Sequence, residues 1–284
     1  MSNRASESSE LIKYEKKYEK DGNHANSDDA ARKTKEVRVT KVLPDEEGPS
    51  RSLEPVDYRR LRNLMTPVRE VELSLARLDP HLVALHELDP RAVTQYNRLA
   101  ITVISSAARR PLKRLLISSP RHGDGRTCVT LNLAAALAST KQRVLVVDAD
   151  LQRPSVSRLL GIDSEVGLAE AVANNMPPDE TVTRLSPVDF YVLPTRGQVE
   201  NSAELLASPN FGRLIEDFES RFDFILFDTA PLLTSADVSL LSLHADAALL
   251  VVRPYTTSAR EMGKAISLLT EDHLFGVVMN RTSG

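Results

Sequence analysis

Short runs of consecutive apolar residues recur along the chain from about residue 114 onward. Each run is five to seven residues long and rich in Val, Ile, Leu and Phe, and its apolar residues do not alternate with polar ones. A strand that helices cover on both faces has this composition, because both of its faces are buried. The runs lie at 114–118, 143–148, 189–194, 222–228, 247–252 and 275–280. The pattern therefore predicts a set of buried, mostly parallel strands.

Stretches with helical character separate these runs. They lie at 127–140, 202–221, 235–244 and 257–272. Strands that alternate with helices predict an α/β fold: a doubly wound, mostly parallel sheet with helices on both faces. In such a sheet ligands bind at the carboxyl ends of the strands, so the residues just after each strand are the candidates for chemistry.

The N-terminal part of the chain has a different composition. Residues 1–52 are rich in Lys, Glu, Asp, Ser and Asn and contain few large apolar groups, which predicts a disordered tail. Residues 53–90 carry scattered leucines and prolines and are expected to form a linker with short elements. The α/β domain is expected to span residues 91–284.

Composition narrows the class of protein. The chain has 284 residues, 42% of them hydrophobic and 26% charged, with a net charge of -3, which is typical of a soluble globular protein and gives no reason to expect a nucleic-acid partner. The single cysteine, Cys128, excludes an internal disulfide. The sequence contains neither a signal peptide nor an apolar run of about 18 residues, so we expect a cytoplasmic protein.

The residues after the first predicted strand, 120–127, resemble a phosphate-binding loop. The motif GxxxxGK[ST] has a glycine at the first position and a lysine at the seventh, where this chain has Pro120 and Arg126. Gly123 and Gly125 remain, and they let backbone N–H groups approach phosphates. A helix is predicted to begin directly behind them, and Thr127 stands where the hydroxyl group binds magnesium. A simple Gly-Asp-Gly turn between strand and helix is the alternative.

Acidic residues end two of the predicted strands. Asp148 and Asp150 lie two residues apart at the end of one strand, so both carboxylates can face the same side. Asp228 ends another fully apolar strand. Three carboxylates at strand ends, together with a glycine loop and a threonine, predict a site for a magnesium nucleotide.

Three ordered motifs extend this pattern across residues 90–281. They read SSPRHGDGRTCVTLNLAAALA, VLVVDADLQRP and FDFILFDTAP. The chain resembles the MinD/ParA-like P-loop ATPases and, within them, the bacterial tyrosine kinases of capsule and exopolysaccharide biosynthesis. The corresponding kinase patterns are TSxxPGEGKSTxxxNLAxxxA, VLLIDADLRRP and FDxIIIDTPP.

The resemblance implies a role for each matching residue. ATP would be bound by the glycine loop and by a segment that contacts the adenine. The implied nucleotide-binding residues are Gly123, Asp124, Gly125, Arg126, Thr127, Cys128, Asn280 and Arg281. Mg²⁺ would be bound by Thr127, Asp150 and Asp228, and Asp148 would be the base that accepts the proton of the attacking hydroxyl, although Asp148 and Asp150 could exchange roles. From the residues alone, Asn280 and Arg281 could equally be a polar cap on a buried strand.

The chain departs from these kinases at several positions. Arg126 replaces the lysine that contacts the β- and γ-phosphates, and arginine is longer, planar and bidentate. It can still neutralise phosphate charge, so Arg126 is a catalytic candidate beside Asp148, with weakened turnover expected. Ala230 replaces a motif proline, and the oligomerisation helix pattern EQYRRLRT appears here as TQYNRLAI.

These departures leave several functions open. The first is a tyrosine-kinase-like ATP phosphotransferase, and the alternatives are a catalytically degenerate, nucleotide-gated adaptor or a MinD/ParA-like ATPase. The resemblance implies a partner, a membrane polysaccharide co-polymerase (chain-length regulator) on a separate chain, with attachment to the inner membrane through it and possible homo-oligomerisation. The kinases' tyrosine-rich C-terminal tail is not found after Asn280. Tyr14 and Tyr18, in an acidic N-terminal context, are its nearest substitute, although a solvated charged segment is the simpler interpretation.

Overall fold

The computed structural model describes residues 11–12, 68–86, 89–269 and 273–280. Nearly all of the segments 1–52 and 53–67, with Tyr14 and Tyr18, lie outside this part, as does Arg281. Within it, no helix is long and apolar enough to cross a membrane.

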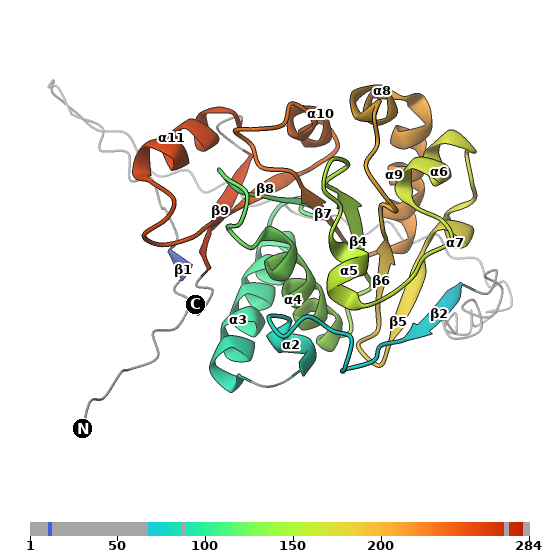
Figure 1. Cartoon of the computed structure of the whole chain (residues 1–284). Helices are drawn as coiled ribbons and strands as arrows, with labels where there is room; N and C mark the ends of the chain where they lie inside the picture. The colour runs from blue at the N-terminus through green and yellow to red at the C-terminus, as the bar shows by residue number, and fades with distance from the viewer. Residues whose placement is uncertain (1–10, 13–67, 87–88, 270–272, 281–284) are drawn as a thin grey trace, which may run out of the picture. The chain divides into compact units, whose positions relative to one another are not determined.

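A single mixed sheet organises the described residues (Figure 1). Its order is β1-β9-β8-β3-β7-β4-β6-β5-β2. The strands are β1 (Leu11–Ile12), β2 (Arg69–Glu72), β3 (Arg114–Ser118), β4 (Val144–Ala149), β5 (Thr183–Ser186), β6 (Phe190–Leu193), β7 (Phe224–Thr229), β8 (Ala247–Val252) and β9 (Leu274–Met279). All neighbours are parallel except the pairs β1–β9 and β5–β6. The six strands predicted from apolar runs are confirmed as β3, β4, β6, β7, β8 and β9.

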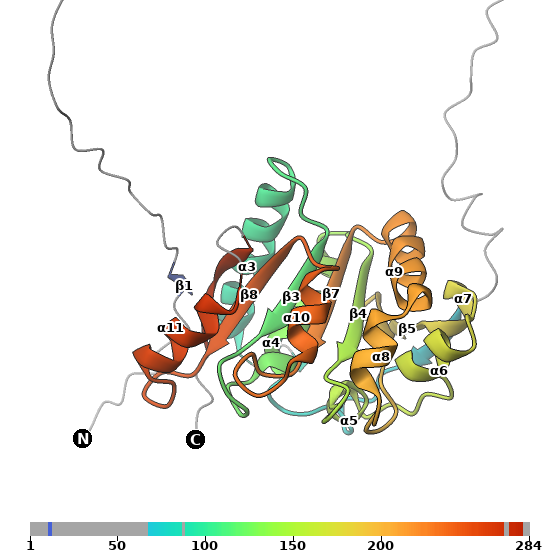
Figure 2. The same ribbon diagram turned by 90° about the horizontal axis from the view of Figure 1, so that it is seen from above.

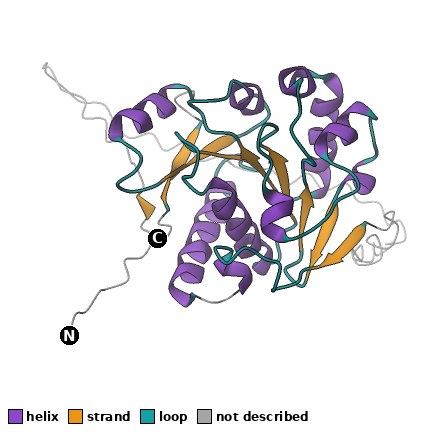
Figure 3. Ribbon diagram, in the orientation of Figure 1, coloured by secondary structure: helices purple, strands orange, loops and turns teal. Residues whose placement is uncertain are grey.

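Helices cover both faces of the sheet, as Figures 1 and 3 show. They are α2 (Val83–His86), α3 (Pro90–Ala107), α4 (Arg126–Ser139), α5 (Val156–Leu160), α6 (Leu168–Ala173), α7 (Pro178–Thr181), α8 (Ser202–Ala207), α9 (Pro209–Arg221), α10 (Asp237–Ser242) and α11 (Ala259–Ser267). Helices α2 to α5 pack on one face and α6 and α8 to α11 on the other; the view from above in Figure 2 shows α8 to α11 along the second face.

The central strands are buried on both sides, which explains their continuous apolar sequence. In β3, Leu115 and Ile117 join the core beneath α3 and α4, whereas Leu116 joins the core on the opposite face. Helix α4 lies against the middle of the sheet and is buried along most of its length. Its alanines have small side chains, which allow this close packing. The doubly wound α/β prediction is therefore confirmed.

Two elements before residue 91 are part of this domain. Strand β2 pairs in parallel with β5 at the sheet edge. Leu82, just before α2, and Leu85, within α2, pack into the core beside α4. Asn132 of α4 fixes this contact, because its Oδ1 accepts the Ala84 N–H at 2.8 Å and its Nδ2 donates to the His81 carbonyl at 3.0 Å. Residues 68–86, which fall in the segment expected to be a linker, thus pack against the predicted domain, whereas residues 53–67 lie outside the described part of the chain.

The predicted helix at 202–221 is two helices. Ser208 has an extended backbone (φ -72°, ψ 145°), its hydroxyl accepts the Phe211 N–H at 3.2 Å, and Pro209 is the first residue of α9. A proline tolerates that first position but disfavours a helical conformation in the residue before it. The Ser-Pro pair therefore ends α8 and begins α9.

Candidate functional site

The glycine loop, residues 119–125, connects the carboxyl end of β3 to the start of α4. Gly123 and Gly125 have φ values of +86° and +90°, which residues other than glycine rarely adopt. Gly125 is the residue before α4, so the free N–H groups of the first helical turn lie directly behind it. The predicted combination of glycine loop and helix start is therefore present.

Arg126, the first residue of α4, points into this loop and is only 8% exposed. Its Nε donates to the Thr229 carbonyl at 2.7 Å, and its Nη1 donates to Ser119 Oγ at 2.7 Å and to the Arg121 carbonyl at 3.0 Å. Its Nη2 donates to Asp150 Oδ2 at 3.2 Å. Four of the five guanidinium N–H groups are thus engaged by the protein itself.

Asp148 lies at the end of β4 and is completely buried. Its Oδ2 accepts the N–H groups of Ser155 and Val156, both at 3.0 Å, whereas its Oδ1 has no hydrogen-bond partner. Burial, and then the nearby Asp228 carboxylate, raise the pKa of Asp148 well above its usual value. A buried carboxyl with one free oxygen is suited to accept a proton.

Asp228 is aligned with Asp148 on the adjacent strand β7. Its Oδ1 accepts the Thr130 hydroxyl at 3.1 Å, and its Oδ2 has no hydrogen-bond partner. Burial raises the pKa of Asp228 to about 6, although Arg126 and the Thr127 and Thr130 hydroxyls oppose this shift. The site therefore contains two buried carboxylates that each leave one oxygen free.

The remaining predicted magnesium ligands are already bonded. Asp150 Oδ1 accepts the Arg153 N–H at 3.0 Å, and its other oxygen faces Arg126. Thr127 Oγ1 lies 2.9 Å from Ser155 Oγ. No group of three His, Cys, Asp or Glu side chains among the described residues is arranged to hold a metal by itself. The free oxygen of Asp228 and the Thr127 hydroxyl are nevertheless hard ligands of the kind that Mg²⁺ prefers when phosphates and water complete its shell, and the Asp150 carboxylate lies beside them, so the residues fit this ion.

Contacts from two other strand ends hold the glycine loop. Asp124 Oδ1 accepts the Thr257 hydroxyl at 2.9 Å, and the Asp124 carbonyl accepts Asn280 Nδ2 at 3.1 Å. A Cβ on Gly125 would lie 2.1 Å from the same Asn280 amide nitrogen. The structure therefore places Asn280, expected near adenine, against the loop backbone. Burial raises the pKa of Asp124.

Cys128 and the rim of the loop complete the set of predicted residues. Burial raises the pKa of the Cys128 thiol to about 12, so the side chain is a neutral thiol. Arg121 and Arg153 are exposed beside the loop, and burial together with Arg126 and Arg153 lowers the pKa of His122. The rim therefore carries two arginines, of which Arg121 also lies 3.5 Å from Glu261, and positive charge here favours a phosphate chain.

Sequence reasoning does not identify several residues that shape this site. Ser119, Thr130 and Ser155 bond to Arg126, Asp228 and Thr127, respectively. The Thr229 carbonyl meets Arg126 across 103 positions of sequence. Ser119 and Thr229 lie within the recognised motifs, but their partners depend on which strands become neighbours.

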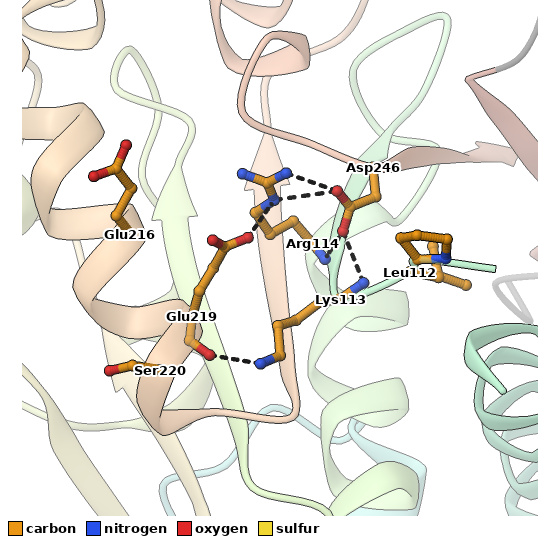
Figure 4. A pocket seen from close by; sticks show the side chains of 8 residues that line it. Leu112, Lys113, Arg114, Glu216, Glu219, Ser220 and Asp246 are labelled. Carbon is orange, nitrogen blue, oxygen red and sulfur yellow. Dashed lines mark hydrogen bonds and ion pairs between the residues drawn. The ribbon is translucent and has the colours of Figure 1, made fainter.

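A pocket of about 570 Å³ lies at the opposite end of the sheet (Figure 4). Three of its charged groups bond to one another: Arg114 lies between Asp246, at 2.7 Å, and Glu219, at 2.9 Å. Lys113 Nζ donates to the Glu219 carbonyl at 2.5 Å. These contacts stabilise the amino ends of the strands, far from the glycine loop, and we assign the pocket no function.

Comparison with known proteins identifies the family of this chain. The model of a family described as "AAA domain" matches residues 113–271. The tyrosine-protein kinase YwqD of Bacillus subtilis (strain 168) is 28% identical over 207 residues, which cover 72% of this chain and 87% of YwqD. Several longer tyrosine-protein kinases match over only 22% to 27% of their own length.

Solved structures show the same fold. The kinase domain of the Escherichia coli tyrosine kinase ETK has a TM-score of 0.64 at 24% identity, covering 79% of this chain and 94% of that domain. The septum site-determining protein MinD from Pyrococcus horikoshii OT3, complexed with Mg-ADP, has a TM-score of 0.50 at 26% identity, covering 58% of this chain and 68% of MinD. The chain belongs to the AAA domain family, with the MinD-like P-loop ATPase fold, and is a homologue of bacterial tyrosine-protein kinases.

Proposed function

We propose that this protein is an ATP-binding, tyrosine-kinase-like P-loop protein of capsule or exopolysaccharide biosynthesis and export, with catalysis weakened at Arg126. The observation that carries the proposal is the pair of buried carboxylates, Asp148 and Asp228, each with a free oxygen beside a glycine loop. The names of its relatives, and the Mg-ADP bound to a protein of the same fold, support ATP and Mg²⁺ as ligands.

Each site residue would have a separate role in binding or catalysis. The loop from Gly123 to Thr127 and the first turn of α4 would bind the phosphates, with Cys128 continuing the turn and Asn280 and Arg281 beside the nucleotide. Thr127, Asp228 and Asp150 would hold Mg²⁺, which would neutralise part of the charge on the phosphoryl group that ATP supplies. Asp148 would hold the proton of the attacking tyrosine hydroxyl on its free oxygen, because its raised pKa increases its affinity for that proton.

A membrane partner is part of the proposal. The motif resemblance implies a polysaccharide co-polymerase on a separate chain, which would attach this protein to the cytoplasmic side of the inner membrane and complete its site. Homo-oligomers are compatible with this role, and no nucleic-acid partner is proposed because the net charge is -3. The isolated chain should therefore turn over ATP slowly, and rapid hydrolysis by the purified protein alone would favour a self-sufficient MinD/ParA-like ATPase.

A second candidate function is a nucleotide-gated adaptor without phosphotransfer. It is favoured by the engagement of Arg126 with Thr229, Ser119, Arg121 and Asp150, since this residue stands where the kinase motif has a lysine for the phosphates. Both candidates require nucleotide binding but differ in turnover, so labelled ATP distinguishes them.

The proposal is tested by calorimetric titration of ATP and ADP with and without Mg²⁺. We expect saturable binding that Thr127→Ala weakens, because the substitution removes a hydroxyl from the loop. The absence of both heat and a thermal shift at millimolar nucleotide would contradict the proposal.

A further inference from the structure

The contacts of Arg126 differ in kind from those of a loop that is ready to bind phosphate. Such a loop presents N–H donors, since phosphate oxygens only accept hydrogen bonds. Here the Arg121 carbonyl and the Ser119 hydroxyl both accept hydrogen bonds from the Arg126 guanidinium, at 3.0 Å and 2.7 Å. The loop is therefore closed around a cation that belongs to the protein.

Asp150 holds this cation from the other side. Its side chain is 5% exposed, and its Oδ2 lies 3.2 Å from Arg126 Nη2. The pair is buried, so each charge depends on the other for compensation. A nucleotide phosphate would compete with Asp150 for the guanidinium and with the guanidinium for the loop.

We propose that Arg126 and Asp150 form an internal latch that occupies the phosphate-binding loop, and that nucleotide binds only after this pair opens. The inference rests on the proposed nucleotide site and adds how access to it is controlled. The four bonds of Arg126 join the loop to the ends of β4 and β7, so opening the pair releases the loop from both strands.

A lysine at position 126 could not form the same latch. Its three N–H donors radiate from a single nitrogen, whereas the arginine fork reaches acceptors on three separate segments through three nitrogens. The latch is thus a property of the arginine that distinguishes this chain from the kinase pattern.

The latch makes a quantitative prediction about affinity. If only the open form binds, the apparent affinity is reduced by the fraction of molecules that are open. Minor conformations of this kind have populations of about 0.1–10%. Asp150→Asn keeps the shape of the side chain but removes its charge, and it should strengthen ADP binding in EDTA by about tenfold or more.

A double-mutant cycle separates the latch from simple electrostatics, because removing any nearby carboxylate also favours an anion. We would measure ADP binding in EDTA for wild type, Asp150→Asn, Arg126→Met and the double variant. The latch predicts a large gain from Asp150→Asn when Arg126 is present and a small gain when Arg126→Met has already removed the guanidinium. Asp223→Asn, which weakens the ion pair with Arg143 at the other end of the sheet, is the matched control and should leave the ADP affinity unchanged.

Amide hydrogen exchange of the nucleotide-free protein provides a readout that needs no ligand. The N–H groups of residues 121–126 should exchange faster in Asp150→Asn and in Arg126→Met than in wild type, while those of β3 stay protected. If one variant does not fold, the other still tests this expectation.

The outcomes separate the two proposals. Equal gains from Asp150→Asn in the wild-type and Arg126→Met backgrounds, or unchanged loop exchange in both single variants, would overturn the latch and leave the nucleotide site intact. Failure of all four proteins to bind ADP would overturn both the latch and the proposed function.

Discussion

The two ends of the same sheet use charged residues in opposite ways. At the amino ends of the strands, Asp246 Oδ2 accepts the N–H groups of Lys113 and Arg114, and Asp246 Oδ1 accepts the Arg114 side chain (Figure 4). At the carboxyl ends, Asp148 and Asp228 are more deeply buried, and each keeps an oxygen without a partner.

The pKa values follow the same division. The hydrogen bonds from Arg114 and from the backbone outweigh burial and lower the pKa of Asp246, whereas burial dominates and raises the pKa of Asp148 and of Asp228. Bonded carboxylates stabilise the folded state, and unpartnered buried ones destabilise it unless a ligand compensates them. The difference is what the proposed function requires: one end of the sheet that serves stability and another that serves binding.

The largest expected effect is at Arg126. Arg126→Lys should raise ATP turnover by about 10² to 10³-fold, equivalent to about 2–4 kcal/mol, because a lysine regains its contact with the γ-phosphate and the other site residues are present. The measurement is ATP turnover and phosphotyrosine signal for both proteins. A loss of activity would show that the site is adapted to arginine, and no activity in either protein would favour the adaptor.

The next effect is at Asp228 and depends on pH. The carboxyl group ionises near pH 4 in an unfolded chain but near pH 6 in the folded protein, so its penalty on stability grows between these values and is constant above them. Asp228→Asn should therefore be more stable than wild type above pH 6, by about 3 kcal/mol at most. Urea unfolding in EDTA from pH 4 to pH 8 measures this difference, and a difference that does not change with pH would contradict the assignment.

Asp246→Asn should give the opposite pH dependence. The pKa of Asp246 is lowered on folding, so the stability that it contributes is present at neutral pH and is lost as the pH falls below about 4. The variant should be less stable than wild type by about 1–3 kcal/mol at pH 7, and the difference should shrink in acid. Its nucleotide affinity should equal that of wild type, and a weaker affinity would show that the two ends are coupled.

The sequence predicted the sheet better than the contacts within the site. Strands such as β3 and β7 are recognisable because burial on both faces requires continuous apolar residues. Strand β5, by contrast, alternates buried and half-exposed residues in only four positions, and β2 is mostly exposed, so neither differs enough from a loop. Strand β2, at the edge of the sheet, and β5, next to it, depend on their neighbours rather than on their own composition.

The site shows the same limit. The motif spacing located Asp148 and Asp228 at strand ends and Gly123 and Thr127 in the loop and helix start that follow β3, and the structure brings these segments together. The motif spacing could not reveal that Arg126 turns toward the Thr229 carbonyl and Asp150, because those contacts depend on the order of β3, β7 and β4 in the sheet.

The smallest expected effect is at the exposed pair of Arg143 and Asp223. Arg143 Nη2 lies 2.8 Å from Asp223 Oδ1, but the two side chains are 55% and 35% exposed, so water and salt screen the interaction. Arg143→Lys loses the two-point contact and should lower the free energy of unfolding by about 0.2–1 kcal/mol, a difference that should shrink in 1 M salt. Urea unfolding at low and high salt measures it. An effect as large as that of Asp246→Asn would mean that exposure does not separate the two ion pairs, and that the stabilising role of this end of the sheet is not concentrated at Asp246.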